Sequence, residues 1–394
     1  MLARRFAVSA STARSSLLRS RGFAAAAQDD KRLNVALVGT GRMGQIRLSG
    51  LQTDPRVAIA AIIDSSIGGE VRAALERQYN TQVFGSVADA QAALAAKDQT
   101  LDGVWIATPT PTHLQLVQDC VNHAGSSLKA IGIEKPVGGS LQEIDDAYAA
   151  CLQHRVQLFC SFQRRFDPSY QALRTACVDQ TKIGKLQSIH TIFRDHPCPP
   201  IEFLKTGGDP FHDLAVHDID YVCDLVGEYP TKVYASGTSL SPELRAVGVM
   251  DKASVWLEFP TTGVVCTMDL SRSAAYGYDQ RVEVAGEFGM LQVQNPPKTA
   301  LVHANVEGVT SDVLSYSFPD RFREAYLLEM DSFIEVIQGK QAPRVHWNAS
   351  RMATVVAEAA RIAAVEKKLV TIKYGKTRQL GPHADPLLEC EYEY

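Results

Sequence analysis

Asp213 and His217 lie four residues apart in a segment that reads as a helix with its own start and end signals. Asp209 can cap the N-terminus, Pro210 fits the first helical position, and Gly227 fits the C-terminal end. A spacing of four places both side chains on one face of an α-helix. A carboxylate beside an imidazole can fix its tautomer and hold it for proton transfer near neutral pH. Because an isolated pair of this kind is more often a surface hydrogen bond, its interpretation depends on motifs elsewhere in the chain.

A glycine-rich turn near the start of the chain has the context of a phosphate-binding site. An apolar, strand-like run precedes it at residues 33–38, and a helix-compatible stretch follows as far as Leu51. The first glycine permits the tight turn, the second lets the backbone approach a pyrophosphate, and the third allows close helix packing. The alternative is an ordinary tight turn without a ligand. The residues predicted to bind a dinucleotide here are Gly39, Thr40, Gly41, Arg42, Met43 and Gly44.

The identity of the dinucleotide is indicated by the next apolar run, residues 57–63, which ends in Asp64. A carboxylate about 20 residues beyond the glycine turn accepts hydrogen bonds from the ribose hydroxyls of NAD. Two serines follow Asp64, and no Arg or Lys occurs before Arg72 to bind a 2′-phosphate. The sequence therefore favours NAD over NADP.

The segment from residue 33 to residue 161 alternates short β-branched runs with longer helix-compatible ones, which predicts a doubly wound parallel sheet. Residues 103–107 and 128–133 read as buried strands, and residues 157–161 as the last strand. Ligands bind at the carboxyl ends of the strands in such sheets. The residues predicted to line the cofactor crevice at this edge are Thr108, Pro109, His113, Glu134 and Lys135. The alternative for Lys135 is an ordinary surface lysine that follows a strand.

The remainder, residues 162–394, shows a different order of strand-like and helix-like segments. Short turns separate several strand-like runs, and Val255, Leu257 and Phe259 alternate with polar residues as in a strand with one buried face. Two amphipathic segments, residues 324–337 and 349–366, read as closing helices. The pattern predicts an α+β domain with a large, mostly antiparallel open sheet. Its expected strands are residues 186–194, 232–236, 253–259, 264–270, 281–285 and 290–293.

Bulk properties exclude several classes of function. The chain has 394 residues, 45% of them hydrophobic and 21% charged, so it can bury the cores of two domains. A formal charge of −4 argues against general nucleic-acid affinity, and no apolar run approaches the length of a membrane span. The eight cysteines show no zinc-type spacing, so we assign no metal.

The N-terminal segment differs from the rest of the chain. Its first 27 residues contain five arginines among Ser, Ala and Leu, and no acidic residue occurs before Asp29. This Arg-rich, acid-poor composition is typical of an organelle transit peptide. We therefore predict that residues 1–32 form a mitochondrial transit peptide and lead, and that the protein resides in the mitochondrial matrix. The alternative is a disordered tail of no consequence.

These motifs together resemble the glucose-fructose oxidoreductase family of dehydrogenases, and most closely its inositol 2-dehydrogenase branch. The resemblance spans nearly the whole chain after residue 32, and only the combination of motifs is specific. It implies that Lys135 lies between nicotinamide and substrate, and that Asp213 and His217 complete the catalytic set. His217 would take the hydroxyl proton, Asp213 would orient it, and Lys135 would stabilise the developing alkoxide. The motifs concerned are residues 39–44, 107–109, 134–136, 162–168, 213–220 and 276–281.

The resemblance also implies substrate contacts from Arg164, Asp195 and Tyr278, and a homodimer or homotetramer. The expected reaction is NAD-dependent oxidation of a cyclic polyol, foremost myo-inositol to 2-keto-inositol. Two alternatives are a sugar or dihydrodiol dehydrogenase of the same fold that uses NAD(P), and a non-catalytic dinucleotide-binding redox sensor. A sensor has no need to keep Lys135, Asp213 and His217 together.

Overall fold

The computed structural model describes residues 32–374, except 124 and 208, and residues 390–393. The predicted transit segment, residues 1–32, lies outside the described residues apart from Arg32.

The first half of the described chain forms a parallel sheet of six strands in the order β3-β2-β1-β4-β5-β6. This is the doubly wound order of dinucleotide-binding folds, as the sequence predicts. All residues of β4 and β5 are buried, because helices cover both faces of such a sheet. The strands are β1 (Leu33–Val38), β2 (Val57–Ile63), β3 (Val83–Phe84), β4 (Gly103–Ile106), β5 (Ala130–Ile133) and β6 (Gln157–Cys160). The helices are α1 (Arg42–Thr53), α2 (Gly69–Tyr79), α3 (Val87–Ala95), α4 (His113–His123) and α5 (Leu141–Gln153).

The second half forms a sheet in the order β12-β11-β7-β10-β9-β8-β15-β16. Adjacent strands of this sheet pair antiparallel, except β7 and β10, which pair parallel. The predicted mostly antiparallel sheet is therefore confirmed. The strands are β7 (Leu186–Arg194), β8 (Lys232–Thr238), β9 (Lys252–Glu258), β10 (Val265–Ser271), β11 (Asp279–Gly286), β12 (Met290–Val293), β15 (Val370–Tyr374) and β16 (Cys390–Glu393). The helices and helical turns are η3 (Gln163–Phe166), α6 (Pro168–Asp179), α7 (Ile201–Gly207), η4 (Phe211–Ala215), α8 (Val216–Val226), α9 (Pro242–Ala246), α10 (Phe318–Arg321), α11 (Arg323–Ile337) and α12 (Trp347–Glu366).

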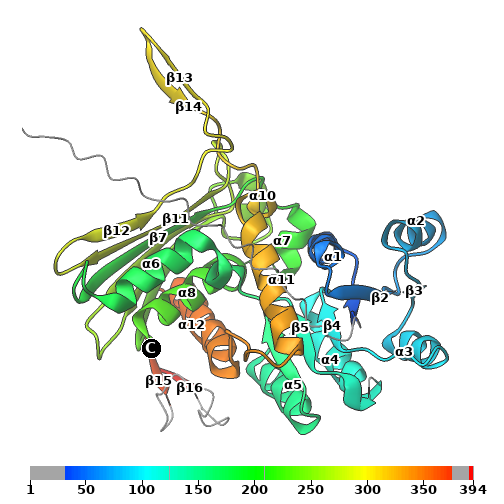
Figure 1. Ribbon diagram of the computed structural model, residues 1–394. Helices are drawn as coiled ribbons and strands as arrows, with labels where there is room; N and C mark the ends of the chain where they lie inside the picture. The colour runs from blue at the N-terminus through cyan, green and yellow to red at the C-terminus, as the bar shows by residue number, and fades with distance from the viewer. Residues whose placement is uncertain (1–31, 124, 208, 375–389, 394) are drawn as a thin grey trace, which may run out of the picture. The chain divides into compact units, whose positions relative to one another are not determined.

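Helices α8 and α12 cover one face of the large sheet (Figure 1). In β9 the buried and more exposed residues alternate, so Val255 and Leu257 point to the helices and Trp256 to the other face. The buried side of α12 is rich in alanine, including Ala353, Ala357 and Ala360, and small side chains allow the helix to pack closely. This packing fixes α8, which begins next to the predicted catalytic residues.

Helix α11 packs against the first sheet, although it follows the second sheet in sequence. Phe333 meets Trp105 edge-on at 5.0 Å between ring centroids. Gly103 leaves the necessary space, because a Cβ atom there would lie 2.4 Å from Ile337 Cδ1. The predicted domain boundary after residue 161 stays a prediction, but the two segments are joined by this helix.

Three features were not predicted from the sequence. Strands β13 (Val302–Asn305) and β14 (Gly308–Ser311) form a hairpin that extends away from the large sheet (Figure 1), and all eight of their residues are exposed. Strands β15 and β16 extend the sheet beyond β8. The predicted helix from Asp209 to Gly227 begins instead with the π-helical turn η4. No helix within the described segments is long and apolar enough to cross a membrane.

Candidate active site

The turn η4 sets the position of Asp213. Asp209 caps the segment as predicted, since its Oδ1 accepts hydrogen bonds from the backbone N–H groups of Phe211 and His212. The following turn is wider than an α-helical one, because π-helical bonds join residues five apart. Gly227 ends α8 in the left-handed conformation, also as predicted. Asp213 therefore lies in the wide turn and His217 in the first turn of α8.

Asp213 is held between two cations. Its Oδ1 accepts a hydrogen bond from Lys135 Nζ at 2.9 Å, and its Oδ2 accepts one from Arg272 Nη1 at 2.6 Å. Lys135 Nζ also donates to the backbone oxygen of Asp213 at 3.1 Å. Burial acts to raise the pKa of the Asp213 carboxyl, but Lys135 and Arg272 together lower it to about 2. Asp213 is therefore a permanent anion that fixes Lys135.

His217 lies in aromatic surroundings beside this ion cluster. Its ring meets Phe162 and Phe193 edge-on at centroid distances of 5.9 and 6.4 Å. Burial, followed by the positive charges of Lys135 and Arg164, holds the pKa of His217 well below its ordinary value. The imidazole is consequently neutral at physiological pH and able to accept a proton.

The expectation that the Asp213 carboxylate orients His217 is wrong. Both carboxylate oxygens bind Lys135 and Arg272, and His217 Nδ1 is buried without a hydrogen-bond partner in the described part of the chain. The physical reason is that the cations Lys135 and Arg272 occupy both carboxylate oxygens, which a spacing of four along the chain cannot reveal. Asp213 acts on Lys135 instead.

The three residues expected to contact substrate differ in exposure. Arg164 is 1% exposed, and its two terminal nitrogens donate to Asp218 at 2.5 Å and Gln280 at 2.6 Å. Tyr278 is 2% exposed and packs against Phe193. Asp195 is partly exposed, and burial raises its pKa to about 6 despite the positive charge of Arg272. Asp195 is thus the most accessible of the three, and Arg164 and Tyr278 lie behind the surface of the site.

The glycine turn fits a dinucleotide. Gly39 has a φ of +90°, and a Cβ atom on Gly44 would lie 2.0 Å from the oxygen of Gly39, so both positions require glycine. A Cβ atom on Gly41 would meet nothing within 4 Å among the described residues. Helix α1 begins there without a side-chain cap or an acidic first turn. Open space in front of uncapped N–H groups suits a pyrophosphate.

Asp64 lies next to this turn. Its Oδ2 accepts hydrogen bonds from the backbone N–H and the hydroxyl of Thr40, and its Oδ1 accepts two from Ser66. Partial burial acts to raise the pKa of Asp64, but the bonds from Ser66 and Thr40 lower it. An ionised carboxylate at this position suits ribose hydroxyls and repels a 2′-phosphate.

Two residues predicted to contact the cofactor also bind other parts of the protein, and their contact with the cofactor stays a prediction. His113 is 1% exposed, and its ring nitrogens lie 2.9 Å from the backbone oxygens of Thr108 and Pro136. It thus connects the segments that follow β4 and β5. Glu134 binds Arg47 Nε at 2.7 Å and Trp105 Nε1 at 3.1 Å.

The other predicted cofactor residues are placed around the glycine turn and β4. Thr108 Oγ1 accepts a hydrogen bond from Thr112, and Pro109 precedes the short turn that leads into α4. Arg42 donates to Ser317 at 2.8 Å and covers the ring of Phe318. Met43 packs against the hydrophobic core.

Sequence reasoning missed two arginines. Arg272, directly after β10, completes the ion cluster around Asp213. Arg47 joins Glu134 to Glu329 of α11, and Arg47 and Glu329 are both fully buried. A helical Arg three residues after Gly44 is the signal that could have revealed Arg47, because that helix face points into the protein.

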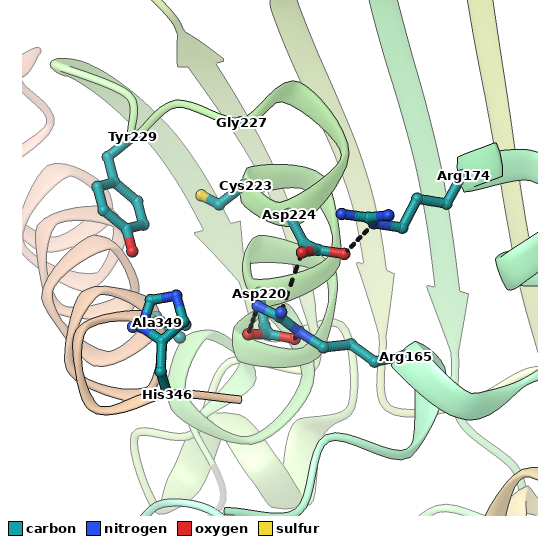
Figure 2. Close-up of a pocket in the computed structure, with 10 residues that line it drawn as sticks. Arg165, Arg174, Asp220, Cys223, Asp224, Gly227, Tyr229, His346 and Ala349 are labelled. Carbon is teal, nitrogen blue, oxygen red and sulfur yellow. Dashed lines mark hydrogen bonds and ion pairs between the residues drawn. The ribbon is translucent and has the colours of Figure 1, made fainter. Parts of the chain in front are cut away.

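A second ionic cluster anchors α8 from the side opposite Arg164. Figure 2 shows the Arg165 guanidinium reaching both Asp220 and Asp224, with Arg174 bound to the other oxygen of Asp224. These residues line a pocket of about 210 Å³. Arg164 and Arg165 thus hold α8 from two sides, through Asp218 and Asp220. In the part of the chain that the structure describes, no group of three or more His, Cys, Asp or Glu could hold a metal ion.

Comparison with known proteins agrees with this geometry. Residues 33–162 match a family model for an oxidoreductase family with an NAD-binding Rossmann fold, and residues 170–292 match the GFO/IDH/MocA C-terminal domain. A myo-inositol 2-dehydrogenase of Thermotoga maritima is 30% identical over 86% of this chain and 99% of that protein. An inositol 2-dehydrogenase of Rhizobium meliloti is 31% identical over 85% of this chain and 98% of that protein.

Solved structures give the same result. A scyllo-inositol dehydrogenase of Lactobacillus casei, solved with NAD(H) and scyllo-inositol, matches with a TM-score of 0.77 at 26% identity, over 86% of this chain and 99% of that one. A myo-inositol dehydrogenase of Corynebacterium glutamicum also matches with a TM-score of 0.77, at 27% identity over 87% of this chain and 99% of that one. The chain belongs to the GFO/IDH/MocA family of oxidoreductases and is an NAD-dependent dehydrogenase acting on CH–OH groups.

Proposed function

We propose that this dehydrogenase oxidises a secondary hydroxyl of a cyclic polyol, with myo-inositol as the favoured substrate and 2-keto-inositol as the product. The observation that carries the proposal is the position of a neutral His217 beside the Lys135–Asp213 ion pair. The similarity to inositol dehydrogenases supports the choice of substrate class.

Alcohol oxidation requires a proton acceptor on the hydroxyl oxygen and a hydride acceptor at the carbon. NAD supplies the second. His217 suits the first, because a neutral imidazole has an unprotonated ring nitrogen that can accept the hydroxyl proton. The proton passes from the substrate oxygen to His217 as the C–H bond breaks.

Lys135 stabilises the negative charge that develops on the hydroxyl oxygen. An ammonium group has three donors, and two of them bind Asp213. The third is available for the substrate oxygen. Since Asp213 holds the group in place before substrate arrives, little reorganisation accompanies the reaction.

Asp195 supports a polyol over a simple alcohol. A polyol presents several hydroxyl groups, and a partly exposed carboxylate near Arg272 can accept hydrogen bonds from those that do not react. A redox sensor requires no such set of groups. A sugar substrate in place of an inositol remains the alternative within the same chemistry.

A substrate panel tests this proposal. Purified protein with NAD is offered myo-inositol, scyllo-inositol, glucose and a dihydrodiol, and formation of reduced nicotinamide is followed by absorbance. We expect the highest kcat/KM with an inositol and loss of activity in Lys135→Ala. Higher kcat/KM with glucose or the dihydrodiol would move the assignment to the alternative, and NAD binding without turnover of any substrate would favour the sensor.

We further propose that the protein forms a homodimer or homotetramer through the large sheet. Tyr234 and Trp256 point away from the face that α12 covers, and Tyr234 is exposed. Sedimentation equilibrium of the wild type and of a Tyr234→Glu, Trp256→Glu variant tests this. We expect the wild type to associate and the variant to dissociate, whereas a monomeric wild type would contradict the proposal.

A further inference from the structure

Arg272 is brought to the site by the one parallel pair of the large sheet. Strands β7 and β10 run side by side with Arg194 opposite Ser271, so the residues that follow them, Asp195 and Arg272, emerge at the same edge. The backbone N–H of Asp195 donates to the oxygen of Ser271 at 2.9 Å. The Arg272 side chain is 0% exposed, although it carries a permanent charge.

The guanidinium connects two points of the wide turn η4. Nη1 donates to Asp213 Oδ2 at 2.6 Å, and Nη2 donates to the backbone oxygen of Asp209 at 3.1 Å. These contacts fix the plane of the Asp213 carboxylate. Its second oxygen, Oδ1, then faces Lys135 Nζ at 2.9 Å.

We propose that Arg272 is a positioning residue of this dehydrogenase, which holds the Asp213 carboxylate so that Lys135 keeps one ammonium donor aimed at the reacting hydroxyl. Without Arg272, Asp213 is free to rotate and to bind Lys135 through both oxygens, which uses the donor intended for substrate. The expected loss of turnover rests on the proposed function. The expected change in the contacts among Arg272, Asp213 and Lys135 does not depend on it.

Electrostatics supports this role. The charged and titratable groups around Asp213 are Lys135 and Arg272, which lower its pKa, with Asp195 and the neutral His217 nearby. Arg272 also opposes the burial that raises the pKa of Asp195 to about 6. Loss of Arg272 therefore shifts the pKa values of both carboxyls upward. The acid limb of kcat/KM should move to higher pH.

The test compares Arg272→Met, Arg272→Lys and Arg351→Met. Arg351 is the matched control, because it is a buried arginine paired with Asp145 away from the site. We expect kcat of Arg272→Met to fall about 10- to 100-fold, by analogy with the loss of groups that orient the metal-binding residues of metalloenzymes. The Kd for NAD should stay unchanged, and the acid limb should move upward. Arg272→Lys should restore part of kcat, and Arg351→Met should keep both kcat and the pH profile.

A crystal structure of the better-folded Arg272 variant provides a second readout that is independent of turnover. We expect the Asp213 carboxylate to be rotated and the Lys135 contact to change. An unaltered Lys135–Asp213 contact, or wild-type kcat and pH profile in Arg272→Met, overturns the inference. Absence of polyol oxidation in the wild-type enzyme overturns the proposed function instead, and the crystallographic comparison still decides the role of Arg272.

Discussion

At the scale of single residues, the chemistry depends on the protonation states of His217, Asp213 and Asp195. Lys135 and Arg272 keep Asp213 ionised, and an apolar environment with Lys135 and Arg164 nearby keeps His217 neutral. The charges are thus arranged before substrate binds, as preorganised catalysis requires.

Replacement of His217 by Ala should lower kcat about 100- to 10,000-fold, because general base catalysis typically contributes that much. The Kd for NAD, measured by nicotinamide fluorescence, should change little. His212→Ala is the control, since that ring binds Asp209 rather than the ion cluster. If His217→Ala retains near-normal turnover while hydride transfer limits the rate, another group is the base.

The pH dependence of substrate binding should reflect Asp195. Its pKa of about 6 is raised by burial, so the carboxylate is ionised above that pH and protonated below it. Protonation converts one carboxylate oxygen into an O–H donor and reduces the capacity to accept hydrogen bonds from substrate hydroxyls. We expect KM for the polyol to rise as pH falls through about 6, and Asp195→Asn to show a higher KM at neutral pH without this dependence. A pH-independent KM in the wild type would remove Asp195 from the binding site.

The sequence identified Lys135 and Asp213 as parts of one site, and the structure brings them into contact. It could not reveal Arg272, because the partner lies 59 residues away and nothing local marks an arginine after a strand as buried. The predicted contact between Asp213 and His217 failed for a related reason. The spacing of four could not show that Lys135 and Arg272, both distant in sequence, bind the two carboxylate oxygens of Asp213.

At the scale of elements, the doubly wound parallel sheet, the mostly antiparallel second sheet and the bounds of several strands followed from the sequence. Strand β2, for example, spans the predicted Val57–Ile63 because its apolar run ends where Asp64 faces the crevice. The hairpin β13–β14 was missed because its residues, all exposed, show no alternation between a buried and a solvent face. The place of α11 was missed because its partners, Trp105 and Arg47, are distant in sequence.

The glycine turn gives an element-scale prediction. Gly41→Ala should fold normally but raise the Kd for NAD, because its Cβ atom has free space in the described structure and occupies room needed by a pyrophosphate. Gly44→Ala should lower the melting temperature as well, since its Cβ atom overlaps the Gly39 oxygen. Calorimetry of NAD binding and thermal unfolding measure the two effects. Equal NAD affinity in Gly41→Ala and wild type would argue against this pyrophosphate position.

At the scale of the whole molecule, two sheets meet through residues that connect them directly. Lys135 follows a strand of the first sheet, whereas Asp213 lies in η4 and Arg272 follows β10 of the second sheet. The catalytic groups therefore come together only in the complete fold. A sequence pattern can identify the catalytic residues but cannot predict the distances and hydrogen bonds among their side chains.

We propose that residues 1–32 direct the protein to the mitochondrial matrix, on the basis of five arginines and no acid before Asp29. A fluorescent protein fused behind these residues should enter mitochondria and be shortened, as judged by microscopy and immunoblotting. A variant with the five arginines changed to Gln is the control and should stay outside. Full-length fusion in the cytosol would contradict the proposal.

The proposed reaction transfers hydrogen from a ring carbon of a cyclic polyol to NAD. The most direct measurement uses myo-inositol deuterated at C2, with NAD and the purified enzyme, and locates the deuterium by mass spectrometry. We predict one deuterium in each reduced nicotinamide, a slower rate than with unlabelled substrate when hydride transfer limits turnover, and an equal amount of ketone. Reduced nicotinamide without deuterium would place the reaction at another carbon. No reduction of NAD by any inositol, in protein shown to bind NAD, would contradict the account.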